Sequence, residues 1–143
     1  MDIYITGIDY QKAGIENREF FSFTKSSAAQ AMQKALSLSG ADGCVLLSTC
    51  NRTELWLSGS PALSPYLTLC RLKKIPPQQG DALFIHRCGT QAVQHLFELS
   101  CGLKSQIFGE DQIISQVKQA LFLSREAGCA GTVLEKLFQF AIT

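Results

Sequence analysis

Residues 44–58 read CVLLSTCNRTELWLS, and this stretch predicts two consecutive β-strands joined by a polar loop. The continuously apolar run at 44–47 is typical of a short buried strand. Residues 53–58 alternate instead, which is typical of a strand with unlike faces. The alternation sends two side chains to the core, Leu55 and Leu57, and two to the opposite side, Glu54 and Trp56.

The patterns on either side of this stretch add two helices and two further strands. A first strand covers about residues 3–7, and a helix with one apolar face covers 26–39. A second helix covers 61–74, and its predicted inward side chains are Leu63, Tyr66, Leu67 and Cys70. Residues 83–86 form the last strand. The order βαββαβ is that of a ferredoxin-like sandwich, an α+β fold.

In the remaining residues, 89–143, apolar side chains recur only at helical spacing. We expect one helix over about 90–102, a longer one over about 110–127, and a last one from about Thr132. The sequence therefore predicts a sandwich subdomain at 1–88 and an all-helical part that completes the same domain. The last helix reaches the end of the chain without a stop signal, which indicates that the chain is part of a larger protein.

Composition and charge are those of an ordinary globular protein. The chain has 143 residues, of which 46% are hydrophobic and 17% charged, and its net charge is +1. No apolar run approaches the roughly 20 residues of a membrane helix, and no signal peptide is recognisable. We therefore expect a cytoplasmic protein without a membrane partner. The basic cluster of Arg71, Lys73 and Lys74 is interpreted as a solvated helix end, so charge alone does not predict an RNA partner.

The cysteine pattern does not predict a metal or redox site. None of the six cysteines forms a C-x-x-C pair, which argues against a zinc ribbon and a thioredoxin-like motif. Most of them lie among apolar neighbours, where a free cysteine behaves as a small buried side chain. His86, Cys88 and His95 carry metal-ligating atoms, but their spacing fits no common zinc pattern. We expect no metal in this chain.

Cys50 and its neighbours are the strongest candidate for a reactive site in this sequence. If the chain is extended from this cysteine onward, the thiol shares one face with Arg52, Glu54 and Trp56. The arginine charge would then favour the reactive thiolate, and the guanidinium could hold a substrate carboxylate through two hydrogen bonds. The alternative is a packing role for Cys50 and a surface pairing of Arg52 with Glu54, and the spacing alone favours that alternative.

Two further features carry polar residues. Residues 102–116 read GLKSQIFGEDQIISQ, in which Gln112 and Gln116 lie one helical turn apart. A solvated helix start is the simpler interpretation of this spacing. His95 lies on a helix whose other face is apolar, and a lone histidine in such a place is usually exposed or half-buried.

Several segments match the sequence pattern of one enzyme family. The string STCNRTE at 48–54 is the most specific of them. GIDYQKA at 7–13, followed by Arg18 and Glu19, resembles G-[IL]-N-H-K-T-A-P…R-E. HLF at 95–97 with SCGL at 100–103 resembles H-L-F-x-V-A-S-G-L, and GEDQIISQ at 109–116 resembles G-E-P-Q-I-L-G-Q. Over nearly its whole length the chain is thus similar to glutamyl-tRNA reductases, whose N-terminal domain is ferredoxin-like with added helices.

The chain departs from this family pattern at a few positions. In the first segment YQK at 10–12 replaces H-K-T and Gly14 replaces proline, which alters a loop expected to contact substrate. In the last segment Asp111 replaces proline at a helix start, where aspartate fits well, and Ser115 replaces glycine. The departures leave the central family residues in place: Cys50, Asn51, Arg52 and His95.

The resemblance implies reduction of glutamyl-tRNA(Glu) to glutamate-1-semialdehyde with NADPH, the first step of tetrapyrrole synthesis from glutamate. The Cys50 thiolate would attack the ester carbonyl, form a thioester and release the tRNA. His95 matches a histidine important for activity and would act as an acid–base helper near the thiol. The matched substrate-binding positions, besides Cys50, are Thr49, Asn51, Arg52, Ser105, Glu110, Asp111, Gln112 and Gln116.

The hydride donor is expected to bind elsewhere. No G-x-G-x-x-G loop follows a strand in these residues, so we predict no cofactor-binding residue in this chain. In the family an NADPH-binding domain and a dimerisation helix follow this region, which implies a homodimer for the full-length protein. Two rival functions are a non-catalytic ligand-binding module and a stand-alone thiol hydrolase that uses Cys50 and His95. The whole STCNRTE string argues against both.

Overall fold

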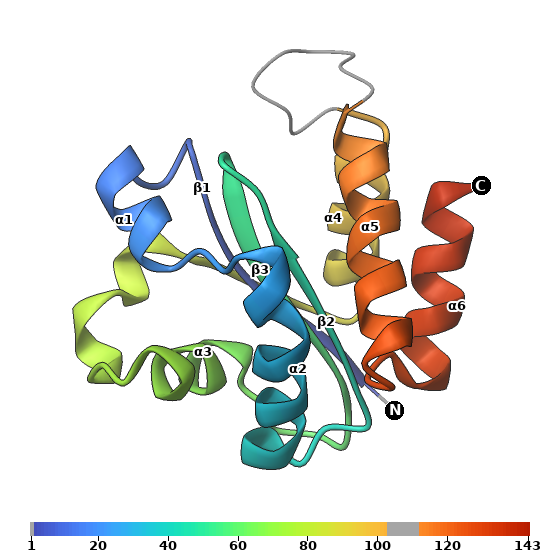
Figure 1. Ribbon diagram of the computed structural model, residues 1–143, viewed down its shortest axis with the longest axis horizontal. Helices are drawn as coiled ribbons and strands as arrows, with labels where there is room; N and C mark the ends of the chain where they lie inside the picture. Colours follow the sequence, from blue (N-terminus) through green and yellow to red (C-terminus); the bar gives the residue numbers. More distant parts are fainter. Residues whose placement is uncertain (1, 103–111) are drawn as a thin grey trace.

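The computed structural model describes residues 2–102 and 112–143, which form one antiparallel sheet with helices on both faces (Figure 1). Within these ranges no helix has the length and apolar character needed to cross a membrane. The strands are β1 (Asp2–Asp9), β2 (Gly43–Ser48), β3 (Arg52–Gly59) and β4 (Ile85–Cys88). The helices are α1 (Ile15–Phe20), α2 (Lys25–Ser39), α3 (Pro65–Lys73), α4 (Thr90–Ser100), α5 (Gln112–Glu126) and α6 (Gly131–Ile142), with 3-10 turns η1 (Pro77–Gln79) and η2 (Asp81–Leu83).

The sheet has the strand order β2-β3-β1-β4, and each neighbouring pair is antiparallel. β1 and β3 lie in the middle and pair along their whole length, from Asp2 opposite Gly59 to Asp9 opposite Arg52. Because side chains alternate along each strand, β3 sends residues to both faces of the sheet. Side chains of β3 therefore contact the helices on both faces of the sheet.

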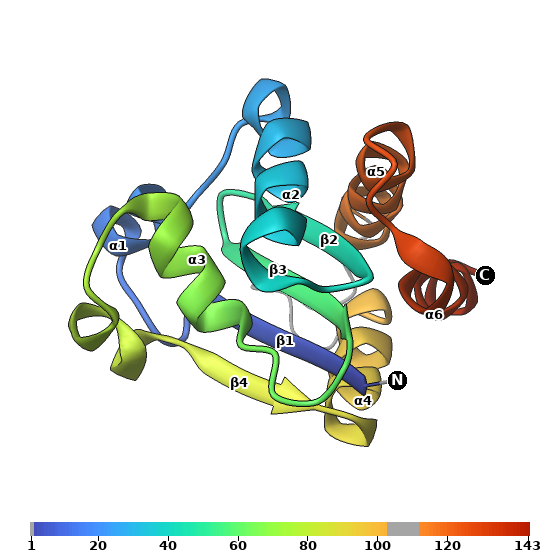
Figure 2. The same ribbon diagram turned by 90° about the horizontal axis from the view of Figure 1, so that it is seen from below.

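Helices cover both faces of the sheet (Figure 2). Each face has its own apolar core. Leu55 and Leu57 pack under α2 and α3, as the sequence predicts, together with Met32 and Leu69. On the opposite face Trp56 is fully buried in a second core with Leu96 of α4, Val117 of α5 and Phe138 of α6. The helices after residue 89 thus turn the second face of the sheet into a core as well.

Several boundaries differ from those predicted, each for a local reason. β1 continues past residue 7 because it pairs with β3 to its end. α3 begins at Pro65 instead of residue 61, because the Ser64 side chain accepts a hydrogen bond from the Leu67 backbone N–H and caps the helix. Leu67, which was predicted to face inward, is 48% exposed. The short helix α1 was not predicted, since none of its residues is buried and no apolar stripe marks it.

Arg71 and Lys74 are exposed, as predicted for a solvated helix end, but Lys73 is partly buried. Its Nζ atom donates a hydrogen bond to the Ser22 carbonyl oxygen at 2.6 Å and lies 4.0 Å from the centre of the Phe23 ring. Burial lowers the pKa of this lysine. The end of α3 therefore holds the segment that leads into α2.

The start of β2 packs tightly against the turn between α5 and α6. The Ser124 hydroxyl donates to the Cys44 carbonyl oxygen at 2.6 Å. Gly43 permits this approach, because a Cβ atom there would lie 2.8 Å from Ser58 Oγ and closer still to the Ala130 carbonyl oxygen. The contact aligns α5 along β2, so the beginning of α5 faces the end of β2.

Candidate functional site

A tight turn between β2 and β3 holds Cys50 at the surface. The Thr49 backbone N–H donates to the Arg52 carbonyl oxygen at 2.8 Å and closes the turn. The Thr49 hydroxyl oxygen accepts from the backbone N–H groups of Asn51 at 3.2 Å and Arg52 at 3.3 Å. The Cys50 side chain is exposed. The turn therefore presents a thiol to solvent on a hydrogen-bonded backbone.

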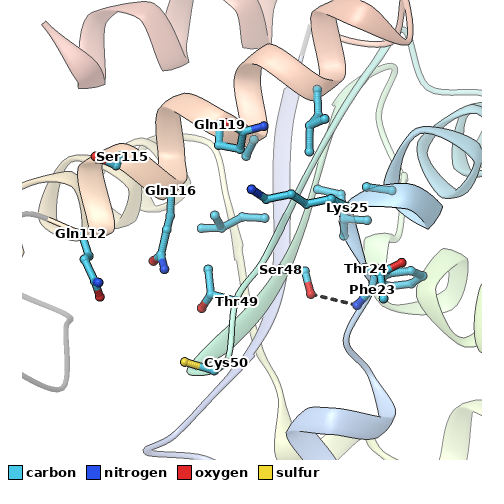
Figure 3. Close-up of a pocket in the computed structure, with 15 residues that line it drawn as sticks. Phe23, Thr24, Lys25, Ser48, Thr49, Cys50, Gln112, Ser115, Gln116 and Gln119 are labelled. Atoms are coloured by element: carbon cyan, nitrogen blue, oxygen red, sulfur yellow. Dashed lines mark hydrogen bonds between the residues drawn. The ribbon is translucent and has the colours of Figure 1, made fainter.

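A pocket of about 400 Å³ lies beside this thiol, between the end of β2, the start of α2 and the first turns of α5 (Figure 3). Gln112 and Gln116 extend from α5 toward the turn that carries Thr49 and Cys50, and Lys25 extends from α2 toward α5 (Figure 3). Further polar side chains of α5 in the lining are Ser115 and Gln119, and the apolar lining includes Leu46, Leu47, Ala120 and Leu123. The pocket thus combines an accessible thiol, several amides and an ammonium group.

A buried chain of polar side chains runs from the start of β3 to α4. The Arg52 guanidinium lies 3.4 Å from the Glu54 carboxylate and 3.7 Å from that of Asp9. The Nε2 atom of His95 donates to Glu54 Oε2 at 2.6 Å, and the indole N–H of Trp56 donates to Glu54 Oε1 at 3.0 Å. These contacts satisfy both carboxylate oxygens of Glu54.

The pKa of Glu54 reflects these partners. Burial alone raises the pKa, because it disfavours the charged form. The hydrogen bond and charge of His95, the charge of Arg52 and the hydrogen bond from Trp56 outweigh burial and hold the pKa below its ordinary value. Glu54 is therefore an ionised carboxylate at neutral pH, in the middle of the buried chain.

Comparison with known proteins assigns the chain to a family. The family described as glutamyl-tRNA(Glu) reductase, N-terminal domain, matches residues 6–143. The chain belongs to this family. A glutamyl-tRNA reductase of Acetivibrio thermocellus is 42% identical over 145 residues, which cover 100% of this chain and 44% of that protein. A probable multifunctional siroheme biosynthesis protein of Ruminiclostridium josui is 38% identical, over 100% of this chain and 28% of that protein.

A solved structure agrees with this membership. The glutamyl-tRNA reductase from Methanopyrus kandleri matches with a TM-score of 0.78 and 29% identity, over 98% of this chain and 32% of that chain. The antiparallel four-stranded sheet with its helices is therefore the architecture of the reductase N-terminal domain. The chain spans less than half the length of the curated reductases it matches.

The structure separates the predicted site residues of this reductase domain into two groups. Thr49, Cys50, Gln112 and Gln116 line the pocket, whereas Arg52 and His95 do not line it and are 2% and 4% exposed. Asn51 lies on the turn and donates its backbone N–H to Thr49. Three predicted residues lie outside the described ranges: Ser105, Glu110 and Asp111.

Three geometric expectations need correction. Cys50 does not share a strand face with Arg52, because β3 begins at Arg52 and the cysteine lies in the turn before it. The alternative is also wrong in part, since Cys50 is exposed and the Arg52–Glu54 pair is buried. His95, expected at the surface or half-buried, is buried because Glu54 and Trp56 of β3 hold its ring under α4.

Lys25 and Gln119 are among the polar side chains of the pocket that sequence reasoning missed. For Gln119 a signal was present, because it follows Gln112 and Gln116 at helical spacing on the same helix. For Lys25 no local signal exists, since its place in the pocket depends on how α2 and α5 are packed. Only the tertiary structure brings it into the pocket that Cys50 also lines.

Burial divides the six cysteines of the reductase domain into two sets of free thiols. Cys50, Cys88 and Cys101 are exposed, and the buried ones are Cys44, Cys70 and Cys129. Burial raises the pKa of Cys44 far above its usual range, with a smaller contribution from Cys129, whose own pKa is also raised by burial. These two thiols are therefore protonated and poorly reactive in the folded protein.

The two histidines lie on opposite faces of the sheet. His86 Nδ1 is 3.0 Å from Thr6 Oγ1, and the ring packs edge-on against Tyr66 of α3. His95 packs near Trp56 on the other face. The sheet thus keeps them apart, and the described ranges contain no group of three His, Cys, Asp or Glu side chains that could hold a metal ion.

Proposed function

We propose that this chain carries out the nucleophilic step of a glutamyl-tRNA reductase, in which Cys50 accepts the glutamyl group from glutamyl-tRNA(Glu). The observation that carries the proposal is the exposed thiol on a hydrogen-bonded turn, beside a pocket with amide and ammonium groups. Membership of the family supports it. The complete protein would then reduce the bound group to glutamate-1-semialdehyde with NADPH, at the start of tetrapyrrole synthesis.

The chemical step follows from the chemistry of a thiolate and an ester. The Cys50 sulfur attacks the carbonyl carbon that joins glutamate to the 3′ end of the tRNA. A carbon–sulfur bond forms, the carbon–oxygen bond to the ribose breaks, and the departing oxygen takes up a proton. Water can later hydrolyse the thioester to glutamate and regenerate the thiol. The fixed turn favours attack because the sulfur is already held in place.

We assign binding of the glutamyl group to polar side chains around this thiol. Thr49, Asn51, Gln112 and Gln116 offer hydroxyl and amide groups, and three family positions outside the described ranges complete the set: Ser105, Glu110 and Asp111. Arg52 contributes through its contact with Asp9, the longer of its two ion pairs at 3.7 Å, which a substrate carboxylate can replace. A guanidinium suits this exchange because it binds carboxylates through two hydrogen bonds.

His95 acts indirectly in this proposal. The ring is buried and its Nε2 atom is engaged by Glu54, so the acid–base role that the resemblance implies has no direct path to the thiol within the pocket. Through Glu54 the histidine holds Arg52, whose backbone closes the turn of Cys50. We therefore propose His95 as a positioning residue.

The described residues do not fit a dinucleotide cofactor. A dinucleotide site of the usual kind needs parallel strands and a glycine-rich loop that runs into a helix. Each strand pair described here is antiparallel. We assign NADPH to another domain of the protein and derive no hydride step through these residues.

We also infer the finer features of the domain and its setting. The strand order β2-β3-β1-β4, with α2 between β1 and β2 and α3 between β3 and β4, supports a ferredoxin-like unit at residues 1–88. α4, α5 and α6 complete the domain. The six free thiols support a reducing compartment, the cytoplasm. The full-length protein is proposed to be a homodimer, as the family resemblance implies.

The test is to incubate the purified chain with tRNA carrying radiolabelled glutamate, with and without NADPH. We expect a glutamyl adduct on Cys50 by mass spectrometry, slow release of free glutamate, and no semialdehyde in either case. Cys50→Ser should remove the adduct, whereas Cys88→Ser, which alters another exposed thiol, should keep it. An adduct that survives Cys50→Ser would overturn the assignment of Cys50 as the nucleophile. Semialdehyde made by this chain alone would overturn the assignment of NADPH to another domain.

A further inference from the structure

The pocket beside Cys50 contains a lysine, Lys25, that has no role in the acyl transfer proposed above. Of the described residues in its lining, Lys25 is the one that carries a formal charge at neutral pH. Its side chain extends from the start of α2 across the pocket toward α5 (Figure 3). Within the described residues its ammonium group forms neither an ion pair nor a hydrogen bond. The ammonium is therefore available to an anion that enters the pocket.

The position of Lys25 is not explained by the stability of its helix. Lys25 is the first residue of α2, where the aligned peptide dipoles place partial positive charge. A cation is unfavourable there, and the first turn of α2 contains no acidic residue to offset it. The helix start is already capped by Thr24, whose side chain accepts from the Ser27 backbone N–H. A residue that works against local stability often serves function instead.

The two other cations near the turn do not line this pocket. Arg52 is 2% exposed and lies between two carboxylates, Asp9 and Glu54. Arg18 lines a neighbouring hollow of about 280 Å³ together with Glu19, and it donates to the Ala13 carbonyl oxygen. Lys25 differs from both, because the described lining of its pocket contains no carboxylate.

We propose that Lys25 shares with Arg52 the binding of the one free carboxylate of the glutamyl group, its side-chain carboxylate, and so helps to distinguish a glutamyl from a glutaminyl ester. The inference rests on the proposed function and adds a specificity residue to it. Glutamate and glutamine have almost the same shape, so charge is the property that can separate them. An ammonium attracts the carboxylate and gains little from the neutral amide, while Gln112 and Gln116 can hydrogen-bond to either group.

The test uses small activated esters, which carry no phosphate. The purified chain is mixed with the 4-nitrophenyl α-esters of glutamate and glutamine, and acylation of Cys50 is followed by nitrophenolate release and mass spectrometry. Lys25→Met should slow acylation by the glutamyl ester roughly tenfold, the size expected for a charge-assisted hydrogen bond in a partly exposed pocket. The glutaminyl ester should react at nearly the same rate as before, and Lys25→Arg should retain the preference.

Matched controls separate the possible outcomes. Lys34→Met removes an exposed lysine from the same helix and should change neither rate. An equal loss with both esters, or no loss with either, would overturn the assignment of Lys25. A loss seen only with glutamyl-tRNA would also overturn it, because Lys25 would then bind a tRNA phosphate. If the wild-type chain forms no Cys50 adduct with either ester or with glutamyl-tRNA, the proposed function fails, and the role of Lys25 fails with it.

Discussion

The Nε2 atom of His95 lies 2.6 Å from Oε2 of Glu54, and both side chains are almost completely buried. This contact joins α4 to β3, so it connects the helical part of the domain to the sheet. Glu54 also contacts Arg52, whose backbone closes the turn that presents Cys50. The helical part is therefore linked to the thiol through three consecutive polar contacts.

The first prediction is that Glu54→Gln lowers the free energy of unfolding by about 1–3 kcal/mol at pH 7, because a neutral amide cannot satisfy the same donors. The folded pKa of Glu54 is below its ordinary value of 4.5. Its carboxylate therefore stabilises the fold above that pH, and the stabilisation is lost as the pH falls through the folded pKa. Urea unfolding from pH 7 to 3 should show the gap between variant and wild type closing at the acid end.

Asp81→Asn provides the control for this pH series. Asp81 pairs with His86 at 3.1 Å, but its side chain is 68% exposed, so the substitution should leave the unfolding curve nearly unchanged. A gap for Glu54→Gln that stays constant down to pH 3 would contradict the assignment of an ionised, stabilising carboxylate.

The second prediction concerns thiol reactivity. Limiting iodoacetamide at pH 7 should label Cys50 before the buried thiols, because Cys50 is exposed on its turn. Cys44 should stay unlabelled until the chain unfolds, since burial raises its pKa and blocks access. Peptide mapping by mass spectrometry measures the order. Labelling of Cys44 or Cys101 while Cys50 stays untouched would rule out an accessible nucleophile at position 50.

The sequence predicted the fold best where apolar residues recur at a regular spacing along a segment. β2, β3 and α2 could be predicted because apolar residues recur with the spacing of a strand or a helix. α1 could not, because it buries no residue and so leaves no pattern. The burial of Trp56 depends on helices far along the chain, and no local pattern around β3 reports it.

The same limit applies to the candidate site. Cys50 and the α5 glutamines stood out from short strings and helical spacing. The burial of Arg52 between Asp9 and Glu54 could not be predicted from such local patterns. The guanidinium and the two carboxylates meet only because β1 pairs with β3. Lys25 likewise reaches the pocket only through the packing of α2 beside α5.

The third prediction tests the contact that positions α5. Gly43→Ala should destabilise the fold by about 1–3 kcal/mol, because the added Cβ would overlap the Ala130 carbonyl oxygen and lie 2.8 Å from Ser58 Oγ. Thermal unfolding measures the loss. Gly14→Ala is the matched control, since a Cβ there meets no atom within 4 Å and the backbone φ is −72°. Equal effects of the two substitutions would show that the β2 contact is not tight.

The last prediction concerns Arg52, where charge and geometry can be separated. Arg52→Lys keeps the positive charge but replaces a planar fork of donors with a single ammonium group, which cannot contact Asp9 and Glu54 in the same way. We expect a loss of about 1–3 kcal/mol in the free energy of unfolding. We also expect slower acylation of Cys50 by glutamyl-tRNA, because the arginine backbone closes the turn and its side chain is the proposed partner of a substrate carboxylate.

Arg87→Lys is the control, because Arg87 is exposed on β4 and its guanidinium donates to the neighbouring His86 carbonyl oxygen. That substitution should change neither stability nor acylation. Urea unfolding and the Cys50 adduct assay should be run on both variants. If Arg52→Lys lowers stability but leaves acylation unchanged, the arginine serves the fold alone and the pocket needs no second cation. If Arg52→Lys slows acylation in chains that remain folded, the buried arginine also contributes to acylation of Cys50. The Glu54–His95 contact, which holds the arginine in place, then contributes to acylation as well.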